Sequence, residues 1–358
     1  MRSSGRVATI VVVIYSSEEM TMTYYIGLDV SVENTAICVI DATGHIEKEF
    51  SARCHPDNLA TVLDPFSKMI GAIGLEAGPM SAFLADGLKQ RGLDSVLMET
   101  RRDHAALSAV PVKTDRRDAR GIAELLRMGW FQPVHLKIPV ARDLRLMLSA
   151  RDTLGRRVRE LDNSVRGLVR GFGLRVPTGA RGRFCDLVRD PIADNPVLEA
   201  AISPLLSARD AMAEEFTKLD KLVRDQSRND DVCRRLMTIP GVGAVVAMTF
   251  RAAIDDPKRF RSSKSVGACF GLTSRRYQSG ETDRVTSITK AGDASVRAAL
   301  YEAAHVMLVR TNRWTPLKAW VMRVSARRCA KRAKIALARK LAVIMHRMWI
   351  DGTEFRTA

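Results

Sequence analysis

One run of apolar residues constrains the fold of this chain more than any other feature. Its apolar residues follow one another at alternating steps of four and three, at Leu154, Val158, Leu161, Val165, Leu168 and Phe172. Such a heptad repeat marks the seam of a coiled coil, because it keeps one apolar stripe facing a partner helix. A second run follows Ser203-Pro204, a favourable helix start, and continues the spacing at Met212, Phe216, Leu219 and Val223. We therefore expect a coiled-coil stalk and connector over residues 136–230, whose two antiparallel helices pair within one chain or between chains.

The segment before the stalk alternates between strand and helix patterns. Three short β-rich runs separated by turn residues come first, at residues 24–30, 35–40 and 46–50. Helical stretches then alternate with two further apolar runs, which end at Glu76 and Met98. An opening antiparallel meander followed by alternating strands and helices predicts a mixed sheet covered by helices. We place this α/β domain at residues 22–135 and treat residues 1–21 as a poorly ordered extension.

The charge of the chain indicates a polyanionic partner. Its 358 residues carry a net charge of +17 and a pI near 10.0, and so basic a surface attracts phosphate backbones whatever their sequence. From Arg310 to the end there are thirteen Lys or Arg residues and only two acids. We divide the helical C-terminal part into residues 231–310 and a basic tail, 311–358. The tail helix, 321–349, is expected to place one face on the core and one on phosphate.

The cysteines and histidines argue against a zinc site. There are six of each, scattered, with no CxxC pair and no histidine at zinc-ligand spacing, so we expect reduced thiols in a cytoplasmic protein. Carboxylates remain as the metal ligands, which favours hard Mg²⁺, with Mn²⁺ as an alternative. The longest apolar run, residues 8–15, is far shorter than the roughly 20 residues that span a bilayer. No membrane partner is expected.

Four carboxylates occupy positions suited to a metal site. Asp29 lies within an apolar strand and Glu76 ends another, and strand ends are where α/β folds place ligands. Asp115 and Asp118 lie one helical turn apart and share a helix face. Each position has an ordinary alternative: Asp29 can cap the following turn, and the aspartate pair can complement a helix dipole after Thr114 as N-cap. Together the four can hold one or two Mg²⁺ ions that clamp a phosphate, a pattern that resembles the RNase H-like, RuvC-type nuclease fold.

Basic residues near these and other polar motifs are candidates for nucleic-acid contact. Around the aspartate pair they are Lys113, Arg116, Arg117 and Arg120. A polar loop that contains Ser279 adds Arg275, Arg276, Arg284 and Lys290. A serine hydroxyl needs a base, a metal or a strongly polarised phosphate to act as a nucleophile, and these cations can supply the last. The alternative is an ordinary turn serine.

A glycine pair, Gly241 and Gly243, lies between apolar helical segments. The arrangement looks like a helix-hairpin-helix, in which a glycine turn lets backbone N–H groups approach a phosphate. A tight turn between two helices, with no ligand, fits the same residues.

The motifs as a set resemble those of the DEDD transposases of the insertion-sequence one-hundred-and-ten family. They follow the family's order from about Met22 to Val309, as Tyr25-Ile-Gly-Leu-Asp29-Val-Ser, Gly74-Leu-Glu76-Ala, Lys113-Thr-Asp115-Arg-Arg-Asp118-Ala, Ile239-Pro-Gly-Val-Gly243, Phe270-Gly-Leu-Thr and Tyr277-Gln-Ser279-Gly-Glu. The resemblance implies a RuvC-like α/β domain, a coiled-coil stalk and a mainly α transposase domain with a helix-hairpin-helix-like element.

The resemblance also implies roles for individual residues and partners. By position, Asp29, Glu76, Asp115 and Asp118 match the family's Mg²⁺-binding tetrad, and Ser279 matches the serine that forms a covalent phosphoserine link with DNA. The family implies a composite site, in which the tetrad of one subunit meets the serine of another in a homodimer or homotetramer. It further implies double-stranded DNA partners, namely element ends and target, and a structured noncoding bridge RNA as guide. The implied setting is prokaryotic and nucleoid-associated.

Two departures from the family limit this transfer, and two rival functions remain. Residues 1–21 precede the usual start, and the tail after Thr311 is unusually basic. One rival is a RuvC-like junction endonuclease, which uses metal-activated water and needs no serine. The other is a non-catalytic nucleic-acid scaffold, whose acids only stabilise helices.

Overall fold

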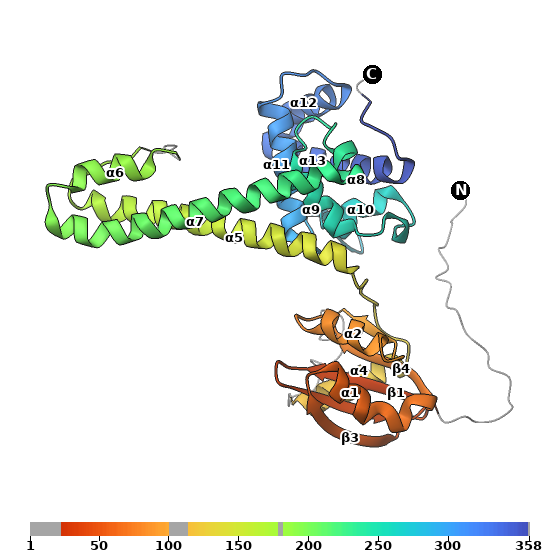
Figure 1. The fold of residues 1–358 in the computed structure, drawn as a ribbon. Helices are drawn as coiled ribbons and strands as arrows, with labels where there is room; N and C mark the ends of the chain where they lie inside the picture. Colours follow the sequence, from red (N-terminus) through yellow and green to blue (C-terminus); the bar gives the residue numbers. More distant parts are fainter. Residues whose placement is uncertain (1–22, 100–113, 178–181, 357–358) are drawn as a thin grey trace, which may run out of the picture. The chain divides into compact units, whose positions relative to one another are not determined.

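The chain divides into two compact units, residues 1–137 and 138–358 (Figure 1). The computed structural model describes residues 23–99, 114–177 and 182–356. The predicted N-terminal extension, residues 1–21, and Lys113 lie outside the described residues. The boundary between the units falls close to the predicted end of the α/β domain.

The first unit is built on one five-stranded mixed sheet. Its strands are β1 (Tyr24–Val30), β2 (Asn34–Ile40), β3 (Ile46–Arg53), β4 (Ile70–Glu76) and β5 (Ser95–Met98). The order is β3-β2-β1-β4-β5, with β1 antiparallel to β2, β2 antiparallel to β3, and β1, β4 and β5 parallel. The predicted meander and mixed sheet are confirmed.

Helices cover both faces of this sheet. On one face lie α1 (Pro56–Leu63), a short 3₁₀ helix (Asp64–Met69) and α2 (Ser81–Lys89), which pack over Ile26 and Leu28. On the other face, α4 (Asp115–Arg127) buries alanines against Cys38 and Ile40. Because side chains alternate along a strand, Asp29 shares the α4 face with Gly27.

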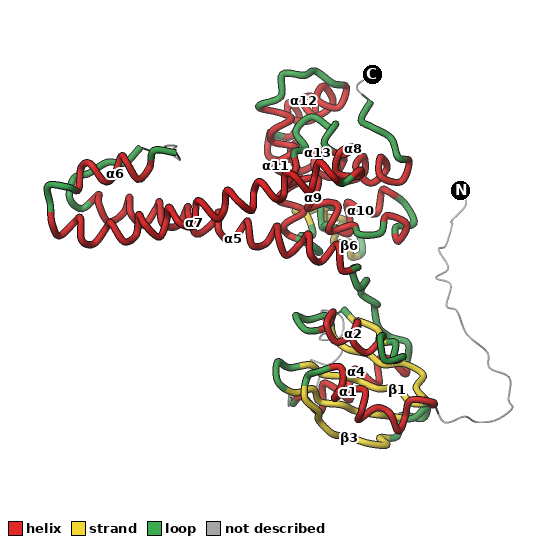
Figure 2. Tube along the Cα trace, in the orientation of Figure 1, coloured by secondary structure: helices red, strands yellow, loops and turns green. Residues whose placement is uncertain are grey.

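The second unit is mostly helical (Figure 2). Helices α5 (Pro139–Arg170) and α7 (Pro196–Asn229) form a long antiparallel pair, against which α6 (Phe184–Ile192) packs. The other helices are α8 (Asp231–Leu236), α9 (Ala244–Ile254), a 3₁₀ turn (Pro257–Arg259), α10 (Ser263–Cys269), α11 (Ala294–Val309), α12 (Pro316–Arg328) and α13 (Ala330–Asp351). A two-stranded ribbon, β6 (Ser274–Ser279) and β7 (Thr282–Ile288), interrupts them. The sequence predicts a loop there, so this ribbon corrects that prediction.

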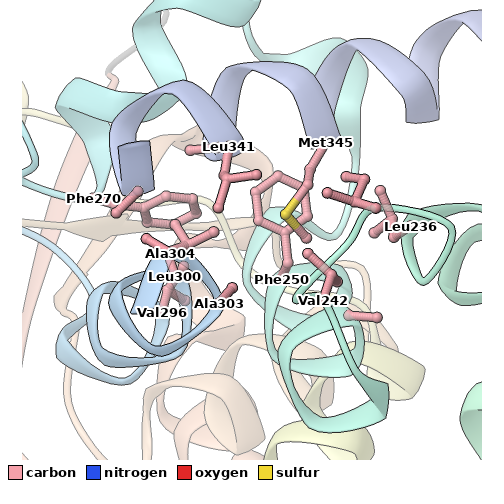
Figure 3. Packing of buried hydrophobic residues seen from close by; sticks show 14 of the residues in the cluster. Leu236, Val242, Phe250, Phe270, Val296, Leu300, Ala303, Ala304, Leu341 and Met345 are labelled. Atoms are coloured by element: carbon pink, nitrogen blue, oxygen red, sulfur yellow. The ribbon is translucent and has the colours of Figure 1, made fainter. Parts of the chain in front are cut away.

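One hydrophobic core joins the base of the stalk to the helices that follow it. Figure 3 shows Phe250, Phe270, Leu300, Leu341 and Met345 meeting between α9, α11 and α13. The core also takes in side chains from the base of α5 and α7. The base of the stalk, the 231–310 segment and the tail therefore share one core.

The stalk helices exist as predicted, but their buried stripe has a different register. Gly155, Asp162, Val165 and Val169 are buried, whereas Leu168 is 53% exposed. Val165 belongs to the predicted and the observed stripe alike, whereas burial at 155, 162 and 169 falls one position after the predicted leucines. The paired helices are confirmed, and the coiled coil stays a prediction.

Two predicted helix boundaries are wrong. Helix α7 begins eight residues before Pro204, where Asn195 caps the N–H groups of Val197 and Leu198 at 3.1 Å each, so Pro204 lies inside the helix. The single tail helix, 321–349, is two helices, because Cys329 adopts a φ of 76° and breaks it.

Candidate functional site

The two strand carboxylates lie at one edge of the sheet in the first unit. β1 and β4 run parallel, and Leu28 pairs with Leu75, so Asp29 and Glu76 are the next residues on neighbouring strands. Every second residue of β4 points to the same face of the sheet, so Glu76 shares a face with Ala72 and Gly74, which pack beneath α4. Both carboxylates, each half-buried, therefore face the α4 side of the sheet.

Helix α4 brings the aspartate pair to the same edge. A Cβ on Gly27 would lie 2.0 Å from the backbone oxygen of Ala119, so the helix touches β1 where the strand has no side chain. At its other end, Arg127 donates to the backbone oxygen of Ala42, beyond the start of β1. The helix thus runs antiparallel to β1 and begins near the carboxyl ends of β1 and β4. Asp115 and Asp118 lie in its first turn.

The N-cap of α4 follows the ordinary pattern for a helix start. The Thr114 hydroxyl accepts from the N–H of Arg117 at 3.4 Å, and both aspartates lie where the helix dipole favours negative charge. This confirms the expected cap. It is compatible with a metal role, because the side chain of a first-turn aspartate can serve the dipole and a cation together.

The four carboxylates fit a hard divalent cation in kind, since all donors are carboxylate oxygens. Three of them, Asp29, Glu76 and Asp118, are half-buried, and Asp115 is exposed. Across residues 23–99, 114–177 and 182–356, however, no three His, Cys, Asp or Glu side chains form a group that could hold a metal ion. The elements place the donors at one edge without preassembling a cage of three ligands.

The cations on α4 differ in how they are engaged. Arg120 forms a bidentate pair with Glu49 of β3, with Nη2 to Oε2 at 2.6 Å. This hydrogen bond, against the opposing effect of burial, lowers the pKa of Glu49. Arg116 and Arg117 are exposed. Of the three, Arg120 has a structural task on the sheet, and the predicted nucleic-acid contacts of all three stay predictions.

Ser279 lies at the tip of the β6–β7 ribbon. It pairs with Thr282 across a two-residue turn, Gly280-Glu281, in which Gly280 has a φ of 55°. Every residue of β6 is exposed, and so is every residue of β7 except the last. The hydroxyl is therefore open to a large ligand.

The two faces of the ribbon carry different side chains. Residues paired directly across antiparallel strands share a face, so Tyr277 and Arg284, which pair, lie on the face of Ser279. On the opposite face, Arg276 forms a bidentate ion pair with Asp283, at 2.8 and 2.6 Å. The pair lowers the pKa of Asp283 and confirms that these two residues share a face.

A clamp at the base fixes the ribbon to the helical core. Arg297 of α11 donates through one nitrogen, Nη1, to the backbone oxygens of Phe270, Ala291 and Gly292, at 3.2, 2.8 and 2.9 Å. Beside it, Lys290 takes a φ of 56°, and its N–H donates to Gly271 at 3.1 Å. The predicted DNA-contact residue Lys290 is thus part of the tight turn at the ribbon's base. Sequence reasoning missed Arg297, because its partners are carbonyls that no motif reveals.

The glycine turn between α8 and α9 is explained largely by packing. Gly241 has a φ of 90°, and a Cβ there would lie 2.6 Å from the backbone oxygen of Ala303 in α11. Gly243 is exposed and forms the N-cap of α9 without crowding. The conformation of Gly241 therefore needs no ligand, and phosphate contact at Gly243 stays a prediction.

The basic tail presents a concentrated positive surface. No acidic residue occurs between positions 311 and 350. Around the break at Cys329, five cations are exposed and have no ionic partner among the described residues: Arg323, Arg327, Arg328, Lys331 and Arg332. Elsewhere in the tail some cations are engaged, for example Arg347 with Asp351 at 2.5 Å. The exposed set fits the expectation that one face of the tail is available to phosphate.

Comparison with known proteins places both the four carboxylates and the Ser279 ribbon within transposase sequences. Residues 26–173, which include the four carboxylates, match a family model of DEDD transposases. Residues 233–319, which include Ser279, match the model described as the transposase IS116/IS110/IS902 family. Transposases of the DEDD type generally use a divalent metal.

Individual relatives agree with the family models. The chain is 30% identical over 243 residues to the transposase for insertion sequence element IS1111A of Coxiella burnetii, covering 65% of each chain. It is 29% identical to the putative transposase y4pF/y4sB of Sinorhizobium fredii, over 69% of this chain and 65% of the relative. It is 27% identical to the transposase for IS1328 of Yersinia enterocolitica, over 68% and 73%. The match thus spans about 65% of the length of the first two relatives.

Two further features are common to both units. All six cysteines are free thiols, as expected. In the part of the chain that the structure describes, no helix is both long and apolar enough to cross a membrane.

Proposed function

This chain belongs to the IS116/IS110/IS902 family of transposases, and from that premise we propose that it cuts and rejoins DNA by an attack of Ser279 on a phosphodiester. One observation carries the proposal. A serine lies at the exposed tip of a ribbon in one unit, and four carboxylates gather at one sheet edge in the other. Both features lie inside the two matched regions.

The proposed step exchanges one phosphoester bond for another. A bond forms between Ser279 Oγ and phosphorus as the bond from phosphorus to a sugar oxygen breaks, the hydroxyl proton leaves, and the departing sugar oxygen gains a proton. Attack of a sugar hydroxyl on the phosphoserine reverses these changes and joins new strands. No external oxidant or energy source is needed, because phosphoester bonds are conserved.

Asp29, Glu76, Asp115 and Asp118 are the residues that would hold Mg²⁺, or Mn²⁺ in its place. A bound divalent ion supplies charge neutralisation at the phosphate. The carboxylates would hold that ion at the carboxyl ends of β1 and β4. The strand order, with helices on both faces, supports an RNase H-like, RuvC-type assignment of this unit.

We extend the proposal to partners. The net charge of +17 supports nucleic acid as partner, and the family resemblance supports double-stranded element ends and target with a structured noncoding guide RNA. The resemblance also supports a composite site, in which the tetrad of one subunit meets Ser279 of another in a homodimer or homotetramer. The absence of a recognisable base-reading motif agrees with specificity supplied by an RNA.

Two substitutions test this proposal. Ser279→Ala removes only the nucleophile from an exposed position, so we expect loss of covalent protein–DNA adducts and of strand exchange, with binding retained. Asp118→Ala should abolish Mg²⁺-dependent adduct formation and retain salt-sensitive binding, because phosphate contacts position DNA without the metal. Adducts are measured as labelled duplex DNA that stays with the protein in denaturing gels.

Each rival function predicts a different outcome. Continued cutting by the Ser279→Ala protein would support the metal-dependent endonuclease. Equal behaviour of both variants and the parent protein, with binding but no adduct, would support the scaffold.

A further inference from the structure

We propose that Arg284 is a catalytic residue, whose guanidinium binds the non-bridging oxygens of the phosphate that Ser279 attacks, and that the Tyr277–Arg284 face of the ribbon receives the DNA backbone. The inference rests on the proposed function of Ser279. It assigns Arg284 a specific partner, the attacked phosphate. It excludes Arg276 from that role, because Arg276 lies on the opposite face of the ribbon.

The register of the ribbon carries the geometry. Ser279 pairs with Thr282, and Arg284 lies two residues further along the same strand. Ser279 and Arg284 are therefore diagonal neighbours on one face, and such neighbours lie about 7–8 Å apart, within reach of a long side chain. A phosphate seated on the Ser279 hydroxyl would lie within reach of the guanidinium.

The contacts of the other ribbon arginines single out Arg284. Arg275 donates to the backbone oxygen of Thr289 at 3.1 Å, at the base of the ribbon. Arg276 is held by Asp283 on the opposite face. Arg284 is exposed, and its guanidinium has no hydrogen bond or ion pair with any residue that the structure describes. It is the ribbon arginine whose fork is available to an anion.

The chemistry of the face explains why a cation is needed there. The residues that share the face with Ser279 are Tyr277, Thr282 and Arg284, and none of these is a carboxylate or an imidazole. A serine without an adjacent base depends on positive charge at the phosphate, from a metal ion, from a cationic side chain or from both. Arginine suits this task, because its planar fork donates two parallel hydrogen bonds to a phosphate.

A matched pair of variants on the two faces tests the inference. Arg284→Gln removes the charge from the Ser279 face. The control Arg276→Gln/Asp283→Asn removes the ion pair from the opposite face, where both partners are largely exposed and contribute little to stability. The ribbon ladder is unchanged in both proteins.

The measurement is the single-turnover rate of adduct formation with the full chain and its copurified RNA. The probe is a labelled linear DNA duplex that carries the genomic flanks of this reading frame. At saturating protein, Arg284→Gln should slow adduct formation by about 100-fold or more, the usual loss for one donor to a developing charge. Duplex affinity should fall much less, and Arg284→Lys should recover part of the rate. The control should react at nearly the parent rate.

Each outcome decides between the two proposals. An Arg284→Gln protein that reacts at the parent rate, or no slower than the control, overturns the role of Arg284 and leaves the role of Ser279 intact. Adducts that persist in the Ser279→Ala protein, or are absent from the parent protein, overturn the proposed function and this inference with it.

Discussion

At the scale of single residues, Gly27 decides whether the carboxylates can share one edge of the sheet. A Cβ at this position would lie 2.0 Å from the Ala119 oxygen and 2.6 Å from the Ala123 nitrogen. Both neighbours are backbone atoms of α4, so the clash can be relieved only by moving the helix. The first turn of that helix carries Asp115 and Asp118, so a shift of α4 would displace them from Asp29 and Glu76.

Gly27→Ala should therefore destabilise the first unit by about 1–3 kcal/mol, the usual cost of overpacking. Hydrogen–deuterium exchange should become faster in β1 and α4 and stay unchanged in the α5–α7 pair. Gly78→Ala is the control in the same unit, because a Cβ there approaches only one atom, 4.0 Å away. Equal protection of β1 in the two variants would contradict the close contact.

The residue scale also shows what a sequence can reveal. The positions of Asp29 and Glu76 could be predicted, because Asp29 lies within an apolar strand pattern, Glu76 ends another, and α/β folds place ligands at strand ends. The contact of α4 with Gly27 could not be predicted, since a glycine in a strand is equally consistent with a bulge. Whether Arg284 lies on the same face as Ser279 depends on the register of the two ribbon strands. No residue pattern in the ribbon predicts that register.

At the scale of elements, polar residues set the register of the α5–α7 pair. Asp162 and Arg209 are nearly buried, with side chains 11% and 10% exposed, and their ion pair spans the two helices at 3.0 Å. A second buried pair, Arg151 and Asp220, lies further along the same seam. Leucines alone could pair in several registers, whereas these charges are satisfied in one.

Removal of one partner should be far more harmful than removal of both. Arg209→Leu leaves Asp162 buried without its cation, so we expect a loss of about 3–5 kcal/mol. The double variant Asp162→Leu/Arg209→Leu should recover most of that loss. Thermal unfolding followed by circular dichroism measures both. A double variant as unstable as the single one would show that the pair itself, rather than the stranded charge, provides stability.

The elements that sequence analysis missed share one physical reason. The ribbon strands read Ser-Arg-Arg-Tyr-Gln-Ser and Thr-Asp-Arg-Val-Thr-Ser-Ile, with polar residues on both faces, so they lack the alternation that marks a half-buried strand. The heptad run indicated a pair of helices correctly, but burial follows Gly155 and Asp162 rather than the leucines. The break at Cys329 has no local signal, since cysteine is no turn former.

At the scale of the whole molecule, positive charge is unevenly used. Many surface cations lie beside acids, whereas the five around Cys329 have no ionic partner among the described residues. Phosphate contacts release condensed counterions, so only cations that reach the backbone contribute to the salt dependence of binding. We therefore expect the tail to contribute more to the salt dependence of nucleic-acid binding than its length alone would suggest.

A fourfold variant, with Arg327, Arg328, Lys331 and Arg332 changed to Gln, tests this expectation. If all four contact phosphate, the slope of log affinity against log salt should fall by about 3.6. The control removes four acid-paired cations, Arg157, Lys218, Arg228 and Arg347. Fluorescence anisotropy of a duplex DNA over a salt series gives both slopes. Equal decreases would show that net charge alone controls binding.

The exposed ribbon also affects how this protein can change over evolutionary time. Nearly all its side chains face solvent, and its attachment relies on Arg297 and backbone carbonyls at the base. Substitutions near the tip therefore leave the core intact, and under the proposed function selection on them acts through chemistry and DNA contact rather than through folding. Such a segment can acquire new substrate preferences by point mutation. The carboxylate edge packs against α4, so substitutions there also disturb the sheet.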